Sequence, residues 1–138
     1  MRTKAFENTM AMVRQDEGQF ANLPRDHGKE TYVGIARAFW PSWAGWTIID
    51  SLRNSPGFPK ILSRNLELQN LVDDFYYTQF WVKIGGDRIP DEIAQTIMND
   101  TINAGISGGI KCAEQLVGLP STGVLSQNLI NKLNNLPK

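Results

Sequence analysis

Residues 17–35 read EGQFANLPRDHGKETYVGI, and their composition differs from that of the chain on either side. Glycine, asparagine, aspartate and proline recur through this stretch, and each of them favours turns. Near its end, Thr31, Tyr32 and Val33 favour extended backbone. The pattern predicts an irregular loop with a short β-hairpin over residues 18–36. A loop of this length in a compact domain is often functional.

An amphipathic helix is predicted on the N-terminal side of this loop. Phe6, Met10 and Val13 lie at spacings of four and three, so a helix over residues 4–16 places them on one face. Glu17 is therefore expected where the helix meets the loop.

Helical periodicity dominates the rest of the chain. Further helices are predicted over residues 42–52, 59–84, 91–104, 107–117 and 124–135. The expected fold class is mainly α, with one irregular or β-hairpin excursion near residues 18–36. Cys112 falls in one of these helices beside apolar residues, and we expect it to be a buried thiol.

Three tryptophans gather just after the turn-rich stretch, at Trp40, Trp43 and Trp46. Because large aromatic side chains are mostly buried, we expect them to pack in the core. The alternative is that one of them stacks on the face of a sugar.

Composition narrows the class of protein. The chain has 138 residues, which suits a single domain over residues 1–138. Fourteen basic and 14 acidic residues give zero net charge, so no nucleic-acid partner is expected. The one cysteine excludes an intrachain disulfide and a cysteine-rich zinc site.

The sequence also bears on location. The N-terminal residues lack the apolar core of a secretory signal peptide, and no window reaches the roughly 20 apolar residues of a membrane span. We expect synthesis in the cytoplasm without membrane insertion. The sequence does not indicate an oligomeric state.

Two carboxylates and a hydroxyl carry the candidate chemistry. Asp26 follows Glu17 by nine residues, and Thr31 follows Asp26 by five. Glycoside hydrolysis needs one acid to protonate the leaving oxygen and a second carboxylate to activate water or attack the sugar. A nearby hydroxyl can hold the water. We expect the domain body to desolvate Glu17 and keep it protonated, and Asp26 to stay ionised on a wetter loop.

The same stretch resembles the signature of glycoside hydrolase family 108, the bacterial and phage N-acetylmuramidases of endolysin type. The usual form of that signature is E-G-G-Y-x-N-x-P-x-D-x-G-G-x-T-x-x-G-I. The residues that match it are Glu17, Gly18, Asn22, Pro24, Asp26, Gly28, Thr31, Gly34 and Ile35. The chain departs from it at Gln19, Phe20 and Lys29.

Looser matches extend the resemblance over most of the chain. They lie at Phe80-Trp81, at residues 85–87, at residues 100–105 and at residues 115–125. They imply a catalytic helix and loop over residues 1–36 and peptidoglycan-binding-like helices over residues 90–138. Family members usually continue with a further aromatic and arginine-rich segment, which this sequence does not contain.

The resemblance implies a lysozyme-like helical fold and cleavage of the β-1,4 bond from N-acetylmuramic acid to N-acetylglucosamine in peptidoglycan glycan strands. By similarity to phage-type lysozymes, Glu17 is the expected acid, Asp26 the base or electrostatic stabiliser, and Thr31 the residue that orients the water. Asn103 and Tyr32 are expected to contact substrate, although Asn103 equally suits a helix cap. No metal or organic cofactor is expected.

Three alternatives remain open. A lytic transglycosylase needs the acid Glu17 without a water-activating Asp26. A non-catalytic peptidoglycan-binding or scaffold protein could use the same fold, as could a regulatory protein without affinity for cell wall. An enzyme of this kind would reach the wall by holin-type release or dedicated secretion.

Overall fold

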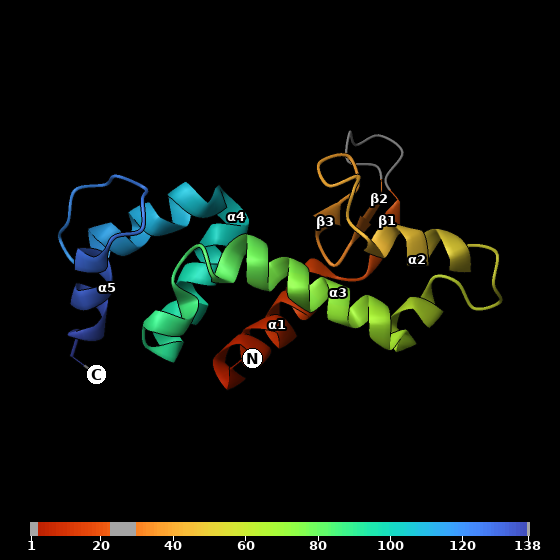
Figure 1. Cartoon of the computed structure of the whole chain (residues 1–138), viewed down its shortest axis with the longest axis horizontal. Coiled ribbons are helices and arrows are strands. Elements are labelled where there is room, and N and C mark those ends of the chain that lie inside the picture. Colours follow the sequence, from red (N-terminus) through yellow and green to blue (C-terminus); the bar gives the residue numbers. More distant parts are fainter. Residues whose placement is uncertain (1–2, 23–29, 138) are drawn as a thin grey trace. The chain divides into compact units, whose positions relative to one another are not determined.

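The computed structural model describes residues 3–22 and 30–137 (Figure 1). The chain divides into two compact units, one formed by Met1–Met10 with Phe75–Lys138 and the other by Ala11–Asp74. Each unit is described by itself. The described residues are mainly helical with a small antiparallel sheet, so the predicted fold class is confirmed. That the chain folds as one domain stays a prediction.

Helix α1 spans Lys4–Glu17, one residue longer than predicted. Its predicted apolar face is confirmed, because Phe6, Met10 and Val13 are all buried. The hydroxyl of Thr3 accepts a hydrogen bond from the backbone N–H of Phe6 at 3.3 Å, which satisfies one of the free donors of the first turn.

The predicted hairpin is part of a three-stranded antiparallel sheet of order β1-β2-β3. The strands are β1 (Phe20–Asn22), β2 (Glu30–Tyr32) and β3 (Ile35–Ala36). Val33 and Gly34 form the turn from β2 to β3, with φ values of 47° and 77°. A positive φ disfavours a β-branched residue, so the burial of Val33 must offset a strained backbone.

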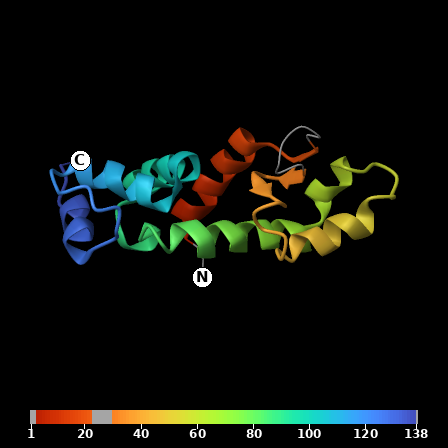
Figure 2. The same ribbon diagram turned by 90° about the horizontal axis from the view of Figure 1, so that it is seen from above.

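The remaining elements of the Ala11–Asp74 unit are helical. The chain runs from the sheet into α2 (Gly45–Leu52), then through the 3₁₀ turn Lys60–Arg64 to α3 (Leu66–Tyr76) (Figure 2). Helix α2 begins at Gly45, later than predicted. The ring of Trp43 packs against Gly45 so closely that a Cβ there would lie 2.3 Å from it. The buried apolar side chains of this unit are Val13, Tyr32, Val33, Ile35, Trp46, Ile49, Leu62, Leu68 and Val72.

The single helix predicted over residues 59–84 is interrupted. Asn65 has extended backbone, and its side-chain oxygen accepts from the N–H of Leu68 at 2.9 Å, so a new helix begins there. After α3 the chain forms the π-helical turn Tyr77–Trp81, labelled η2. Periodicity alone does not distinguish these helix types, because all of them bury one face.

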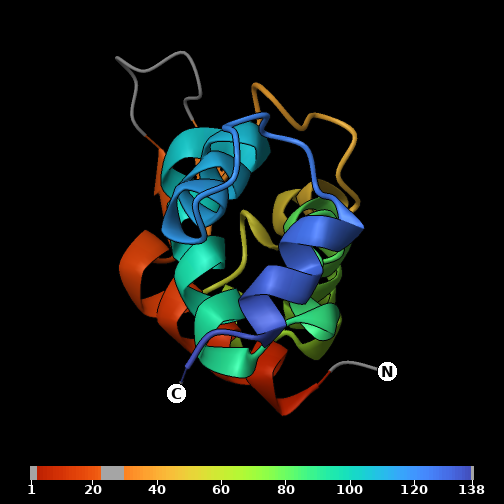
Figure 3. The same ribbon diagram turned by 90° about the vertical axis from the view of Figure 1, so that its left-hand side faces the viewer.

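The other unit contains η2, the 3₁₀ turn Gly86–Arg88, α4 (Asp91–Leu116) and α5 (Gln127–Asn134). Helix α5 contacts α4 (Figure 3). Gly105 has φ 83° and ψ 169°, so it breaks α4 into two segments. The two separate helices predicted on either side of this glycine are therefore confirmed in substance.

The tryptophans and the cysteine differ from one another in burial. Trp46 is buried at 2% exposure, as predicted, whereas Trp43 is half-buried and Trp40 is 37% exposed. The prediction for Cys112 is wrong, because its side chain is exposed. It lies on the flank of α4 beside a pocket, where apolar neighbours in sequence do not enclose it. Among the described residues, no helix is long and apolar enough to cross a membrane.

Candidate active site

Glu17 is the last residue of α1. The N–H of Gly18 bonds the carbonyl of Arg14 at 3.1 Å, and the φ of 77° at Gly18 turns the chain out of the helix towards β1. The side chain of Glu17 is exposed. The described residues therefore do not bury Glu17 as expected, and its role as the acid stays a prediction.

Thr31 lies at the centre of the small sheet. It pairs with Ala21 of β1 on one side and with Ala36 of β3 on the other. Since directly paired residues point to the same face of a sheet, the hydroxyl of Thr31 has only methyl groups as its cross-strand neighbours. Thr31 itself is half-buried.

Asp26 and Lys29 lie outside the described residues. The departure from the family signature at Lys29 is therefore not described either. The described strands on either side of residues 23–29 pair with Asn22 opposite Glu30. The two ends of the segment that carries Asp26 are thus joined by the β1–β2 ladder, next to Thr31.

A hydrogen-bond chain connects the end of α1 to the strand of Thr31. The guanidinium of Arg14 forms an ion pair with Asp73 at 2.7 Å and donates to the backbone carbonyl of Gln69 at 3.1 Å. The amide nitrogen of Gln69 donates to the hydroxyl of Tyr32 at 2.9 Å. These contacts fix the last turn of α1 and strand β2 against the same residue of α3.

Tyr32 therefore has a structural role. Its side chain is 1% exposed, and burial raises the pKa of its hydroxyl despite the hydrogen bond from Gln69. A side chain this buried offers a substrate almost no contact area. The expected role of Tyr32 in substrate contact gives way to one in supporting the sheet.

A four-residue charge network holds the other end of β2. Glu30 accepts from Arg37 at 2.9 Å and from Arg53 at 2.6 Å. Asp50 of α2 accepts from the same two arginines, each at 2.7 Å. Each arginine thus bridges two carboxylates, and the network ties the residue before Thr31 to α2.

The pKa values of the two carboxylates reflect this arrangement. Burial opposes ionisation of Glu30, but hydrogen bonds from Arg53 and Arg37 outweigh it and hold its pKa below the ordinary value. Hydrogen bonds from Arg37 and then Arg53 lower the pKa of Asp50 well below its usual range. Both carboxylates are engaged as ionised partners of arginine, which suits them for positioning rather than for proton transfer.

Aromatic rings lie beside the same arginines. The guanidinium of Arg37 lies 5.1 Å from the ring centre of Trp46, and that of Arg53 lies 5.8 Å from the rings of both Phe20 and Phe58. Cation–π attraction adds to the ion pairs and limits the movement of both arginines. The sequence pattern does not single out Glu30, Arg37 or Arg53.

The remaining candidate, Asn103, belongs to the other unit. It is exposed on α4, two residues before the break at Gly105. Its expected contact with substrate stays a prediction.

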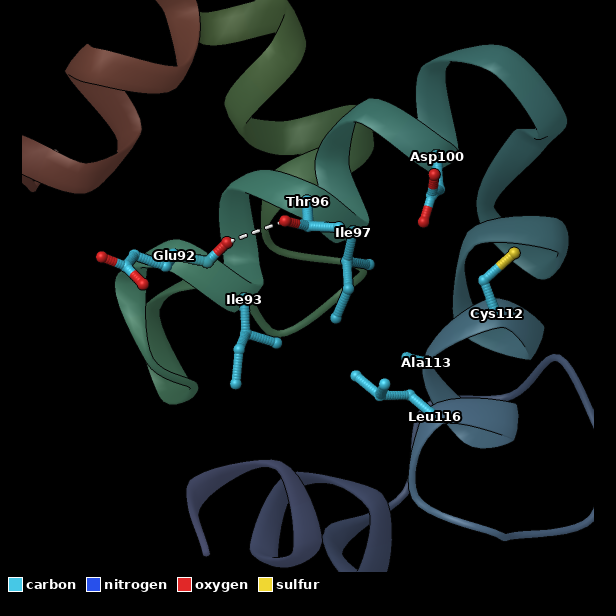
Figure 4. Close-up of a pocket in the computed structure, with 8 residues that line it drawn as sticks. All are labelled: Glu92, Ile93, Thr96, Ile97, Asp100, Cys112, Ala113 and Leu116. Carbon is cyan, nitrogen blue, oxygen red and sulfur yellow. Dashed lines mark hydrogen bonds between the residues drawn. The ribbon is translucent and has the colours of Figure 1, made fainter. Parts of the chain in front are cut away.

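A pocket of about 370 Å³ lies between the two segments of α4 (Figure 4). Its lining residues are Glu92, Ile93, Thr96, Ile97, Asp100, Cys112, Ala113 and Leu116. Asp100, one of its two carboxylates, is in the unit that contains neither Glu17 nor Thr31. Among residues 3–22 and 30–137, no group of three or more histidine, cysteine, aspartate or glutamate side chains is placed to hold a metal ion.

A helix that ends in a carboxylate, followed directly by a small antiparallel sheet in a mainly helical chain, is consistent with a lysozyme-like fold. The family model described as Glycosyl hydrolase 108 matches residues 10–105. The chain therefore belongs to glycosyl hydrolase family 108, and the resemblance seen in the sequence is confirmed. The matched range includes Glu17, Asp26, Thr31 and Asn103.

Comparison with solved structures gives the same fold. The structure of Brucella abortus SagA is similar with a TM-score of 0.65 and 22% sequence identity, over 96% of this chain and 70% of that chain. At this identity the likeness shows a shared fold. No curated protein matches the chain.

Proposed function

We propose that the chain is an N-acetylmuramidase, a peptidoglycan hydrolase that cleaves the β-1,4 bond between N-acetylmuramic acid and N-acetylglucosamine. Membership of glycosyl hydrolase family 108 supports glycosidase activity. The observation that carries the proposal is that Glu17 ends α1 directly before a sheet whose central strand bears Thr31. The contacts of Arg14, Gln69 and Tyr32 hold these two elements together.

In the proposed reaction, Glu17 donates its proton to the glycosidic oxygen as the bond from that oxygen to the anomeric carbon breaks. Asp26 takes a proton from a water molecule, whose oxygen attacks the anomeric carbon from the opposite face of the ring. The hydroxyl of Thr31 holds this water. Direct attack inverts the anomeric configuration, which requires carboxyl groups roughly 6.5–9.5 Å apart.

The surroundings of Thr31 support this role. Its cross-strand neighbours are the short side chains of Ala21 and Ala36, and Thr31 itself is half-buried. The ion pairs of Glu30 with Arg37 and Arg53 fix the strand directly after the segment that carries Asp26. A positioned hydroxyl costs less entropy to use in the transition state than a mobile one.

One observation favours a second function. The side chain of Glu17 is exposed among the described residues, whereas many glycosidases place their catalytic acid in apolar surroundings. A non-catalytic protein that binds peptidoglycan needs no such surroundings. The chain would then bind the wall through the same face without turnover.

Incubation with purified sacculi separates these functions. An inverting muramidase releases new reducing ends, and NMR of the earliest products finds the α-anomer. A non-catalytic protein sediments with sacculi and releases none. A lytic transglycosylase gives 1,6-anhydro products by mass spectrometry and tolerates Asp26→Asn, which an inverting hydrolase does not. Lysis of cells by added protein tests an endolysin-type role, in which holin-type release or dedicated secretion gives access to the wall.

A further inference from the structure

The turn between β3 and α2 presents an uncharged aromatic surface. Residues 38–42, with the sequence AFWPS, are all exposed. Phe39 is 76% exposed and Trp40 is 37% exposed. Contiguous exposed apolar surface often marks a binding site, because its exposure to water costs free energy.

Hydrogen bonds fix the backbone of this turn. The N–H groups of Phe39 and Trp40 both donate to the carbonyl of Ala36, at 3.1 and 2.9 Å. The carbonyl of Trp40 accepts from the buried indole N–H of Trp46 at 2.9 Å and from the backbone N–H of Trp43 at 3.2 Å. A ligand that binds here therefore pays little entropy to order the turn.

The turn starts at the candidate active site. Ala36, whose carbonyl holds the turn, is the residue paired with Thr31. Paired residues in antiparallel strands have Cα atoms roughly 5 Å apart, and a tight turn adds less than about 7 Å. The backbone of Phe39 consequently lies within about 12 Å of that of Thr31, a distance comparable with the length of a disaccharide.

Chemistry favours a sugar over a protein partner on this surface. The face of an aromatic ring is electron-rich and attracts the slightly positive C–H bonds on the flat side of a pyranose ring. The turn carries no charge, so it suits the uncharged N-acetylglucosamine units of a glycan strand. A stable protein interface buries about 800 Å² per partner, more than a turn of five residues presents.

We propose that Phe39, with Trp40 beside it, is a stacking platform for an N-acetylglucosamine ring of the glycan strand, one or two sugars away from the bond that is cleaved. This inference rests on the proposed function, since it takes the glycan strand as the substrate. Phe39 is a binding residue here, and it has no part in proton transfer.

The test is the affinity for peptide-free N-acetylglucosamine oligomers, measured by calorimetry. All proteins carry Glu17→Gln so that no turnover interferes. Phe39→Ala removes the platform and Phe39→Trp restores an aromatic face. Leu66→Ala is the matched control, because Leu66 is a 78% exposed apolar residue of the same unit. Loss of one stacked ring weakens binding by about two- to tenfold.

The proposal predicts weaker binding by Phe39→Ala alone, with Phe39→Trp and Leu66→Ala like the parent. Equal affinity of Phe39→Ala and the parent overturns it, and so does an equal loss in Leu66→Ala. Reducing-end release from sacculi by the chain with Glu17 intact is measured in parallel. If reducing ends are released but Phe39→Ala binds as tightly as the parent, only the platform is overturned. If Phe39→Ala weakens binding but no reducing ends are released, the proposed hydrolysis is overturned and the platform stands.

Discussion

The side-chain amide of Gln69 donates to the hydroxyl of Tyr32 at 2.9 Å, and this bond joins α3 to the strand that carries Thr31. The same amide nitrogen donates to the carbonyl of Leu62 at 3.0 Å. Because Arg14 donates to the backbone carbonyl of Gln69, one residue of α3 holds both the end of α1 and strand β2. The candidate acid and the candidate water-binding hydroxyl thus depend on a residue that takes no part in the chemistry.

Gln69→Ala is expected to destabilise the protein and to lower activity. It leaves the hydroxyl of Tyr32, a side chain with 1% exposure, without its donor. An unpaired buried polar group costs about 1–3 kcal/mol. Thermal and urea unfolding measure the loss, with Asn70→Ala as the control, since Asn70 is the exposed next residue of α3. Equal stability of the two variants would contradict the role given to Gln69.

Glu30→Gln is expected to destabilise the Ala11–Asp74 unit. It removes the charge that pairs with Arg37 and Arg53 and leaves two arginines to share Asp50. Loss of charge-assisted hydrogen bonds at a side chain that is 16% exposed is expected to cost about 1–3 kcal/mol. Urea unfolding measures this cost, and Glu67→Gln, an exposed acid of the same unit, is expected to change little.

The same network predicts acid sensitivity. The pKa values of Glu30 and Asp50 lie below their ordinary values, so both groups contribute stability when ionised. This contribution is complete above the pKa of an unfolded carboxyl, about 4, and is lost as the pH falls through the lower folded values. The melting temperature of the wild-type chain should therefore fall steeply below about pH 4. Glu30→Gln should show a shallower fall, and parallel curves would argue against the network as the cause.

Asp87 has a comparable role in the other unit. Its carboxylate accepts from the hydroxyl of Tyr77 at 2.5 Å and from the indole N–H of Trp81 at 2.8 Å. Trp81 is fully buried, so Asp87→Ala leaves its indole N–H without a partner. We expect a loss of about 1–3 kcal/mol in unfolding free energy. Asp91→Ala, at an exposed position in the first turn of α4, is the control. An equal loss of unfolding free energy in this variant would contradict the stabilising role given to Asp87.

Much of the fold could be predicted because its signals are local. The spacing of Phe6, Met10 and Val13 defines the buried face of α1, and Gly105 marks the break in α4. The sequence does not reveal the boundary at Asn65 or the exposure of Cys112. The exposure of Cys112 depends on how segments pack, whereas the cap at Asn65 is local and is hidden by apolar periodicity that continues across it.

Some residues of the candidate site also have a local signal in the sequence, and others do not. The motif makes Glu17 and Thr31 candidates because it resembles a local signature of family 108, and the family match over residues 10–105 includes both positions. Glu30, Arg37 and Arg53 come together only through the sheet and α2, so no spacing in the sequence signals them. The hydrogen bond that Tyr32 accepts from Gln69, 37 residues away, likewise has no local signal in the sequence.

The most direct test is the initial rate of reducing-end release from purified sacculi by the wild type, Glu17→Gln and Asp16→Asn. The last variant removes an equal charge from the exposed neighbouring position. The account predicts that Glu17→Gln lowers the rate by about 10²–10⁴-fold, the usual contribution of a general acid, while Asp16→Asn keeps near-wild-type activity. A Glu17→Gln protein as active as the wild type would contradict it.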